Sequence, residues 1–129
     1  MQNAKCRMQN ETIMEENVIS EKSFAFSVRI VNLYKYLKSE EKEYILAKQL
    51  LRSGTSIGAN VSEAQRGQSK ADFAAKMCIA LKEANETEYW LRLLYATGFL
   101  NKVQFESMNA DISELISLLA AICKTSTEK

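Results

Sequence analysis

The sequence contains no histidine and no proline, and glycine occurs only four times in its 129 residues. Without histidine the chain cannot build Ser-His-Asp or Cys-His catalytic groups, nor the Glu-x-x-His pairs that hold di-iron sites in helical bundles. Zinc sites without histidine need four cysteines or carboxylate substitutes, and the three cysteines here are scattered. Glycine motifs for phosphate or dinucleotide binding are also missing. These absences predict a protein that is not an enzyme and holds no metal or cofactor.

Long apolar runs are missing as well, since none reaches the roughly 18 residues of a membrane-spanning helix, and residues 1–20 lack the apolar stretch of a signal peptide. The cysteines Cys6, Cys78 and Cys123 form no CxxC pair. Their odd number, and the apolar neighbours of the last two, favour free thiols in a reducing compartment over a disulfide framework. We therefore expect a cytoplasmic protein without a membrane partner.

Charge of one sign does not dominate, because 17 basic and 16 acidic residues leave a formal net charge of +1. Such a chain has no overall field that would attract nucleic acid. Residues 20–38 nevertheless contain four basic residues and one acidic residue, a local net charge of +3. Binding to a polyanion would have to come from local clusters, or from several copies of the chain side by side.

What the chain does contain is helical spacing of apolar residues over most of its length. This spacing predicts four helices, at residues 20–38, 40–65, 70–97 and 102–124. Short connections make successive helices antiparallel neighbours. The predicted fold is all-α, an antiparallel, up-down-up-down four-helix bundle at residues 20–124, with a loose N-terminal arm at 1–19 and a C-terminal tail at 125–129.

The predicted helix ends have sequence signals of their own. Ser39, Ser69 and Asn101 can each cap the helix that follows, and the last two have the spacing of a capping box. Gly98 lies where the end of a helix favours a left-handed residue.

The first predicted helix has more apolar surface than one bundle needs. Phe26 and Ile30 belong to the arc that suits the core, whereas Phe24, Val28 and Val31 lie roughly 150° away around the helix. The second arc is therefore predicted to face away from the core.

The third predicted helix repeats this feature with Ile79, Trp90 and Leu94 on its charged side. Scattered surface hydrophobes, which are common, are one interpretation. We favour a second contact face, in which an interface of Phe24, Val28, Ile79 and Trp90 joins copies of the chain into a homo-oligomer.

The segment from Ser53 to Asn60 is unusual because it places Gly54 and Gly58 inside a predicted helix. Each glycine costs about 1 kcal/mol relative to alanine there, so a close approach of two helices is expected to offset the cost. A phosphate-cradling loop is the alternative. It would need the glycines at a strand-to-helix turn, but leucines flank this segment at helical spacing.

Polar residues beside the core are candidates for fixing the register of the helices. Arg52, Asn60 and Glu63 share one face of the second helix, and Glu88 falls within the apolar stripe of the third. A buried carboxylate needs a partner to stay ionised, and counting outward from the turn places Glu88 level with Lys48, about one turn from Arg52. A catalytic acid is the alternative, although no second acid or nucleophile is clearly placed beside it.

The turn at residues 65–70 is basic and precedes a helix N-terminus, where backbone N–H groups and the helix dipole can accept a phosphate. Most turns of this composition are merely solvated. The candidate nucleic-acid contacts are Arg66 and Lys70 at this turn, and Lys22 and Arg29 on the first helix. No aromatic residues interleave with these charges, so any nucleic acid would be held by its phosphates, without base reading.

Several segments together resemble the 23S rRNA intervening-sequence protein family. Residues 22–34 resemble its first helix, and residues 51–64, which include Ser56-Ile57-Gly58-Ala59-Asn60, resemble its central signature. The third helix agrees at Phe73, Glu88 and Leu91. The resemblance extends over about residues 18–122.

This resemblance implies a helical bundle of unsettled role, encoded in founding members within insertions of 23S ribosomal RNA genes. The family shares its fold with a pentameric retroelement accessory protein that binds nucleic acid, which implies a homopentamer. Our first hypothesis is a non-enzymatic, homo-oligomeric accessory factor for RNA, DNA or a ribonucleoprotein. The second is a scaffold that binds a protein partner and no nucleic acid. An enzyme with its site at a subunit boundary is the third, and the missing histidines disfavour it.

Overall fold

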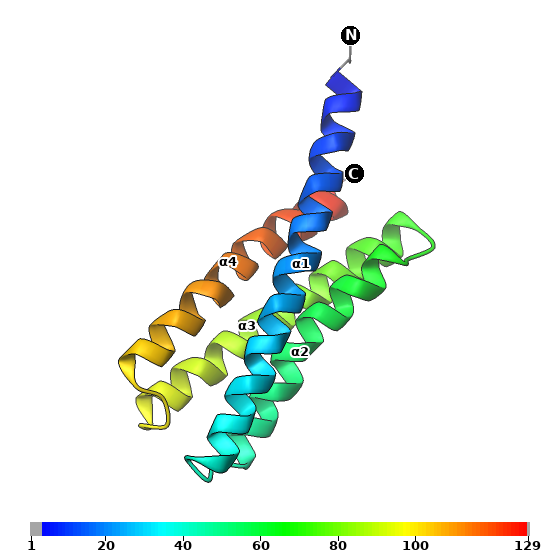
Figure 1. The fold of residues 1–129 in the computed structure, drawn as a ribbon. Helices are drawn as coiled ribbons and strands as arrows, with labels where there is room; N and C mark the ends of the chain where they lie inside the picture. The colour runs from blue at the N-terminus through cyan, green and yellow to red at the C-terminus, as the bar shows by residue number, and fades with distance from the viewer. Residues whose placement is uncertain (1–3, 129) are drawn as a thin grey trace.

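The structure is a computed structural model that describes residues 4–128. Within that range it contains four helices and no strand: α1 (Ala4–Ser39), α2 (Ile45–Gln65), α3 (Lys70–Ala96) and α4 (Lys102–Thr127). Successive helices run antiparallel, as Figure 1 shows, and α1 meets α4 much less closely than the other neighbouring pairs meet. The predicted all-α, up-down-up-down four-helix bundle is confirmed.

The first helix is longer than the sequence predicted. It begins at Ala4 instead of Ser20, so residues 4–19 of the predicted N-terminal arm are helical, whereas residues 1–3 lie outside the described part. In Figure 1 the beginning of α1 extends beyond the ends of the other helices. Glutamate, glutamine, lysine and methionine have good helix propensity, so this largely polar segment can continue the helix. The predicted C-terminal tail at 125–129 is likewise helical as far as Thr127.

Local capping explains where α3 and α4 begin. The Ser69 side chain accepts a hydrogen bond from the Asp72 backbone N–H at 3.1 Å. Asn101 and Gln104 exchange side-chain and backbone hydrogen bonds in a complete capping box. Gly98 follows α3 with a φ of +86°, a left-handed conformation that closes the helix. The caps at Ser69 and Asn101 and the left-handed Gly98 are confirmed, whereas the predicted capping box forms at Asn101 and not at Ser69.

The predicted cap of α2 is wrong. Ser39 is the last residue of α1, and its hydroxyl donates to the Lys35 carbonyl oxygen at 2.9 Å. The second helix begins only at Ile45, where the Glu43 carboxylate accepts a hydrogen bond from the Leu46 N–H. The helix α1 continues through Ser39, so Ser39 lies six residues before the start of α2, too far to cap it.

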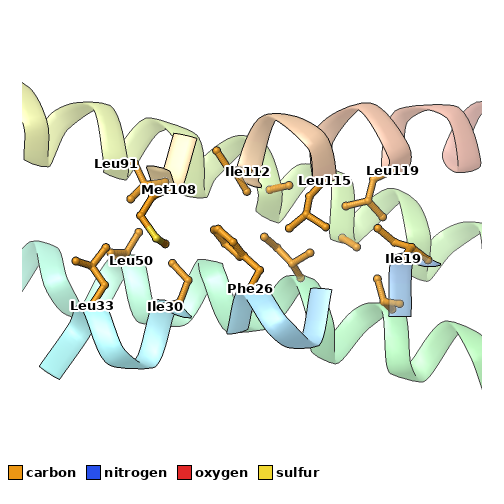
Figure 2. Close-up of a cluster of buried hydrophobic side chains, with 14 of the residues drawn as sticks. Ile19, Phe26, Ile30, Leu33, Leu50, Leu91, Met108, Ile112, Leu115 and Leu119 are labelled. Carbon is orange, nitrogen blue, oxygen red and sulfur yellow. The ribbon is translucent and has the colours of Figure 1, made fainter. Parts of the chain in front are cut away.

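The core is one continuous apolar cluster along the axis of the bundle, and all four helices contribute side chains to it. Figure 2 shows Ile19, Phe26, Ile30, Leu33, Leu50, Leu91, Met108, Ile112, Leu115 and Leu119 filling the space between the helices. Phe26 and Ile30, the predicted core arc of α1, are buried. Leu94, which we assigned to the outer side of the third helix, is fully buried instead. Because α3 packs against both α2 and α4, its buried residues cover a wider part of the helix circumference than a single apolar stripe would.

Helices α1 and α2 approach closely at the two glycines of α2. A Cβ at Gly54 would lie 2.7 Å from Cγ1 of Ile30, and a Cβ at Gly58 would lie 2.9 Å from Oγ of Ser27. Both distances are shorter than real Cβ contacts, so a side chain at either position would force the facing residue of α1 to move. The interpretation of close helix packing is confirmed, and the alternative of a phosphate-cradling loop is wrong because the segment lies in the middle of α2.

Cys78 of α3 and Cys123 of α4 form a disulfide, with Cα atoms 5.0 Å apart. The prediction of free thiols is therefore wrong for this pair. The two residues lie 45 positions apart in the chain and become neighbours only because α3 and α4 are antiparallel. The disulfide removes the compositional argument for a reducing compartment, so the cytoplasmic location stays a prediction. No helix in the described residues is long and apolar enough to cross a membrane.

Candidate interaction surfaces

The buried polar contact between α2 and α3 is formed by Ser53 and Thr87. Their hydroxyl oxygens lie 2.9 Å apart, and both residues are fully buried. The Thr87 hydroxyl also contacts the Glu83 carbonyl oxygen at 2.8 Å, which satisfies it within its own helix. The sequence predicted a buried contact of Glu88 with Lys48 or Arg52 between these helices, and the structure has the Ser53–Thr87 pair instead.

The predicted polar residues of α2 lie outside the core. Arg52 is exposed and forms ion pairs with Glu83, at 3.3 Å, and with Glu86. The hydrogen bond to Glu86 is the largest influence on the pKa of Arg52, which it raises. Glu63 is exposed and pairs with Lys76 of α3 at 2.9 Å. These are surface ion pairs between α2 and α3, and such pairs typically contribute at most about 1 kcal/mol each.

Glu88 does not make the predicted contact. It is half-buried, and within the described residues its side chain has no hydrogen bond or ion pair to Lys48, to Arg52 or to any other group. Thr87, one position earlier, is the residue of α3 that faces α2. Asn60 is also not part of a contact between helices, since its side-chain N–H donates to the Ser56 carbonyl oxygen of α2 itself.

The two basic candidates on α1 are bound to acidic residues of α4. Nζ of Lys22 lies 2.6 Å from Oε1 of Glu114, and this hydrogen bond raises the pKa of Lys22. Arg29 reaches Oδ2 of Asp111 at 2.5 Å and the Ser107 hydroxyl at 2.7 Å. These polar contacts connect α1 to α4, the two neighbouring helices that pack least closely. The positive charge predicted for residues 20–38 is therefore partly compensated within the chain.

The two candidates at the α2–α3 turn are different, because both are exposed and neither has an ion pair among the described residues. Arg66 caps the end of α2, and Lys70 is the first residue of α3, directly after the cap residue Ser69. A hollow of about 610 Å³ opens beside this turn, toward Thr125 and Ser126 at the end of α4. Among the described residues, the structure thus leaves half of the predicted basic contacts without an ion pair.

The second apolar arc of α1 is exposed, as predicted. Phe24, Val28 and Val31 keep 71%, 47% and 36% of their surface accessible. Their spacing places them in one stripe on the side of the helix opposite the core. We call these three residues the α1 stripe.

The outer residues of α3 are less uniform. Ile79 is exposed, whereas Trp90 is half-buried and packs against the core. The indole Nε1 of Trp90 is covered and has no hydrogen-bond partner among the described residues, and its ring meets that of Tyr89 edge-on with centroids 5.1 Å apart. Trp90 therefore does not project outward as predicted.

An aromatic hollow between α3 and α4 was missed by the sequence reasoning. The rings of Tyr95 and Phe105 stack with centroids 4.5 Å apart and planes 7° from parallel. A hollow of about 380 Å³ beside them is lined by Tyr89, Arg92, Leu93, Tyr95, Ala96 and Phe105. The lining residues of α3 between Tyr89 and Ala96 recur every three or four positions, a spacing that indicates one face of a helix. The sequence does not show that Phe105 of α4 lies against this face. No cluster of three or more potential metal ligands occurs in the described residues.

The model of the 23S rRNA-intervening sequence protein family matches residues 15–121. The chain belongs to this family. The resemblance noted in the first and second helices is thereby confirmed, and the match includes all four helices of the bundle.

A similar solved structure comes from the S23 ribosomal protein family of Bacteroides thetaiotaomicron VPI-5482 and is described as a protein of unknown function. It shares 57% sequence identity and a TM-score of 0.83 with this chain, and the match covers 85% of this chain and 98% of the other. No curated protein matches the sequence. Family membership thus establishes the fold, and the function has to be argued from the surfaces described above.

Proposed function

We propose that this chain is a non-enzymatic helical bundle that assembles with copies of itself and serves as an accessory factor for nucleic acid or a ribonucleoprotein. The α1 stripe is the observation that carries this proposal. Aligned, exposed apolar side chains on one helix of a small protein mark a contact surface more often than a chance grouping. A pentamer is the assembly that the family resemblance implies.

The surroundings of the α1 stripe support a contact between proteins. Exposed polar residues border it, among them Glu21, Asn32 and Lys35, and an apolar centre with a polar rim is typical of such interfaces. Because the stripe lies opposite the core, two copies can meet there without disturbing the bundle. Assembly would also repeat the exposed charges of Arg66 and Lys70, and repeated weak contacts with phosphates add up to useful affinity.

Light scattering over a range of micromolar concentrations tests self-association. The wild type should have a mass several times that of the 14.6 kDa chain. Replacing Phe24 and Val28 by glutamate should shift it toward the monomer, since it places charges in the contact. The matched control replaces Ile45 and Val103, which are 77% and 78% exposed, by glutamate. A wild-type mass near 14.6 kDa at every concentration would exclude the assembly.

Nucleic-acid binding is tested by titrating structured RNA and duplex DNA at low and at physiological salt. Binding through phosphates should be indifferent to sequence and should weaken steeply with salt. The double variant Arg66→Glu, Lys70→Glu should bind much more weakly. Lys42→Glu, Lys48→Glu carries the same charge change at the other end of α2 and should bind like the wild type. Absence of binding by the wild type at low salt would favour the alternative, a protein-binding scaffold that uses the α1 stripe for a different partner.

A further inference from the structure

The aromatic hollow between α3 and α4 has the features of a site for a planar ligand. Tyr89 is 55% exposed and Tyr95 is 39% exposed, so part of each ring is available on the surface. Phe105 backs Tyr95 in a parallel stack, which holds the exposed ring in place. A volume of about 380 Å³ lies at the small end of ligand sites, and it suits one planar group rather than a bulky one.

The charges around this hollow favour an anion. Arg92 lines it and none of the other lining residues is acidic. Arg92 is exposed, and within residues 4–128 it takes part in no ion pair. Lys102 is also nearby, but it faces Glu106 at 3.9 Å. The hollow therefore keeps the unpaired positive charge of Arg92, whereas Lys22 and Arg29 of α1 are paired with acidic residues of α4.

We infer that the α3–α4 hollow is a stacking subsite for an unpaired base of single-stranded nucleic acid. A base would stack against the exposed faces of Tyr89 and Tyr95, and Arg92 would hold the neighbouring phosphate. Stacking of a base on an aromatic side chain contributes about 1–3 kcal/mol and tolerates any base. Bases inside a duplex are stacked on each other and cannot enter, so the site selects unpaired strands. This inference rests on the proposed function and names the site that contacts bases.

The decisive comparison is between a short oligothymidylate and an abasic strand of equal length, which keeps the phosphates and lacks the bases. The wild type should bind the oligothymidylate about 5–100-fold more tightly than the abasic strand. Trp90 is the only tryptophan and touches Tyr89, so its fluorescence should change as the base enters. Tyr89→Leu should remove the preference for bases, whereas Tyr89→Phe should retain it. Tyr44→Leu changes another exposed tyrosine and should leave the preference intact.

Arg92 should affect both strands. Arg92→Gln is expected to weaken binding of the oligothymidylate and of the abasic strand by a similar factor, and to reduce the salt dependence by about one phosphate contact. A phosphate role predicts this uniform loss, because the abasic strand presents the same backbone.

Equal affinity for the two strands, or unchanged preference in Tyr89→Leu, would overturn the stacking subsite while phosphate-driven binding, and with it the proposed function, persists. If free thymidine monophosphate binds as tightly as the strand, the ligand is a mononucleotide and the strand assignment is wrong. If Tyr89→Leu changes the oligomeric mass and leaves strand binding unchanged, the hollow is a protein contact. Failure of every nucleic acid to bind would overturn both proposals together.

Discussion

The hydroxyl oxygens of Ser53 and Thr87 lie 2.9 Å apart in the fully buried contact between α2 and α3. This pair aligns the two helices without placing a charge in the core. Each hydroxyl also contacts a carbonyl oxygen of its own helix, Leu50 for Ser53 at 3.4 Å and Glu83 for Thr87 at 2.8 Å. The two side chains are therefore unequal, because the Thr87 contact with its helix is the closer one.

This inequality predicts how substitutions at the pair will behave. Thr87→Val keeps the shape but leaves the Ser53 hydroxyl only its long contact with the Leu50 carbonyl oxygen, and should lower the free energy of unfolding by about 1–3 kcal/mol. Ser53→Ala should cost less, since Thr87 keeps its bond to Glu83. The double variant should cost less than the sum of the two. Urea unfolding followed by circular dichroism measures all three, and strict additivity would show that the hydroxyls do not interact.

Gly54 should not tolerate alanine despite its place in a helix. An added Cβ would meet Ile30 at 2.7 Å, so Gly54→Ala is expected to lower the free energy of unfolding by about 1–3 kcal/mol through overpacking. In an Ile30→Ala background the same substitution should be neutral or stabilising, because the clashing atoms are gone. Thermal and urea unfolding of the wild type, the two single variants and the double variant completes this double-mutant cycle. A stabilising Gly54→Ala in the wild-type background would contradict the close contact of α1 and α2.

The disulfide between Cys78 and Cys123 should stabilise the bundle. It closes a loop across a separation of 45 residues, for which the loss of unfolded-state entropy contributes about 3–4 kcal/mol. Reduction, or replacement of both residues by serine, should lower the free energy of unfolding by that order. Cys6→Ser leaves the bond intact and is the matched control. Reaction of Cys78 and Cys123 with a thiol reagent in the native, unreduced protein would contradict the bond.

Glu88 should be far less important than a buried charge. It is half-buried and without a partner among the described residues, so Glu88→Gln and Glu88→Ala should each change the free energy of unfolding by no more than about 1 kcal/mol. Urea unfolding of both variants checks this expectation. A loss above about 2 kcal/mol in Glu88→Ala alone would instead reveal a partner that needs the carboxylate.

Much of the fold was readable from the chain because its signals are local. The caps at Ser69 and Asn101 and the left-handed Gly98 depend on residues within one or two turns, and the apolar stripes repeat every turn of the helix. The predicted boundary at Ser39 was wrong, since serine can end one helix or begin the next, and here α1 continues through Ser39 while α2 begins only at Ile45.

The candidate surfaces were less readable, because each depends on which residues of different helices face one another. The sequence alone determined that the chain has no histidine chemistry, that its helices are amphipathic, and that α1 carries a surplus of apolar residues. The tertiary structure decided that Cys78 forms a disulfide with Cys123, and that Thr87 instead of Glu88 contacts α2. It also decided that Lys22 forms an ion pair with Glu114. Rotation of a helix by one residue moves a side chain about 100° around the axis, and only packing against the neighbouring helices sets that rotation.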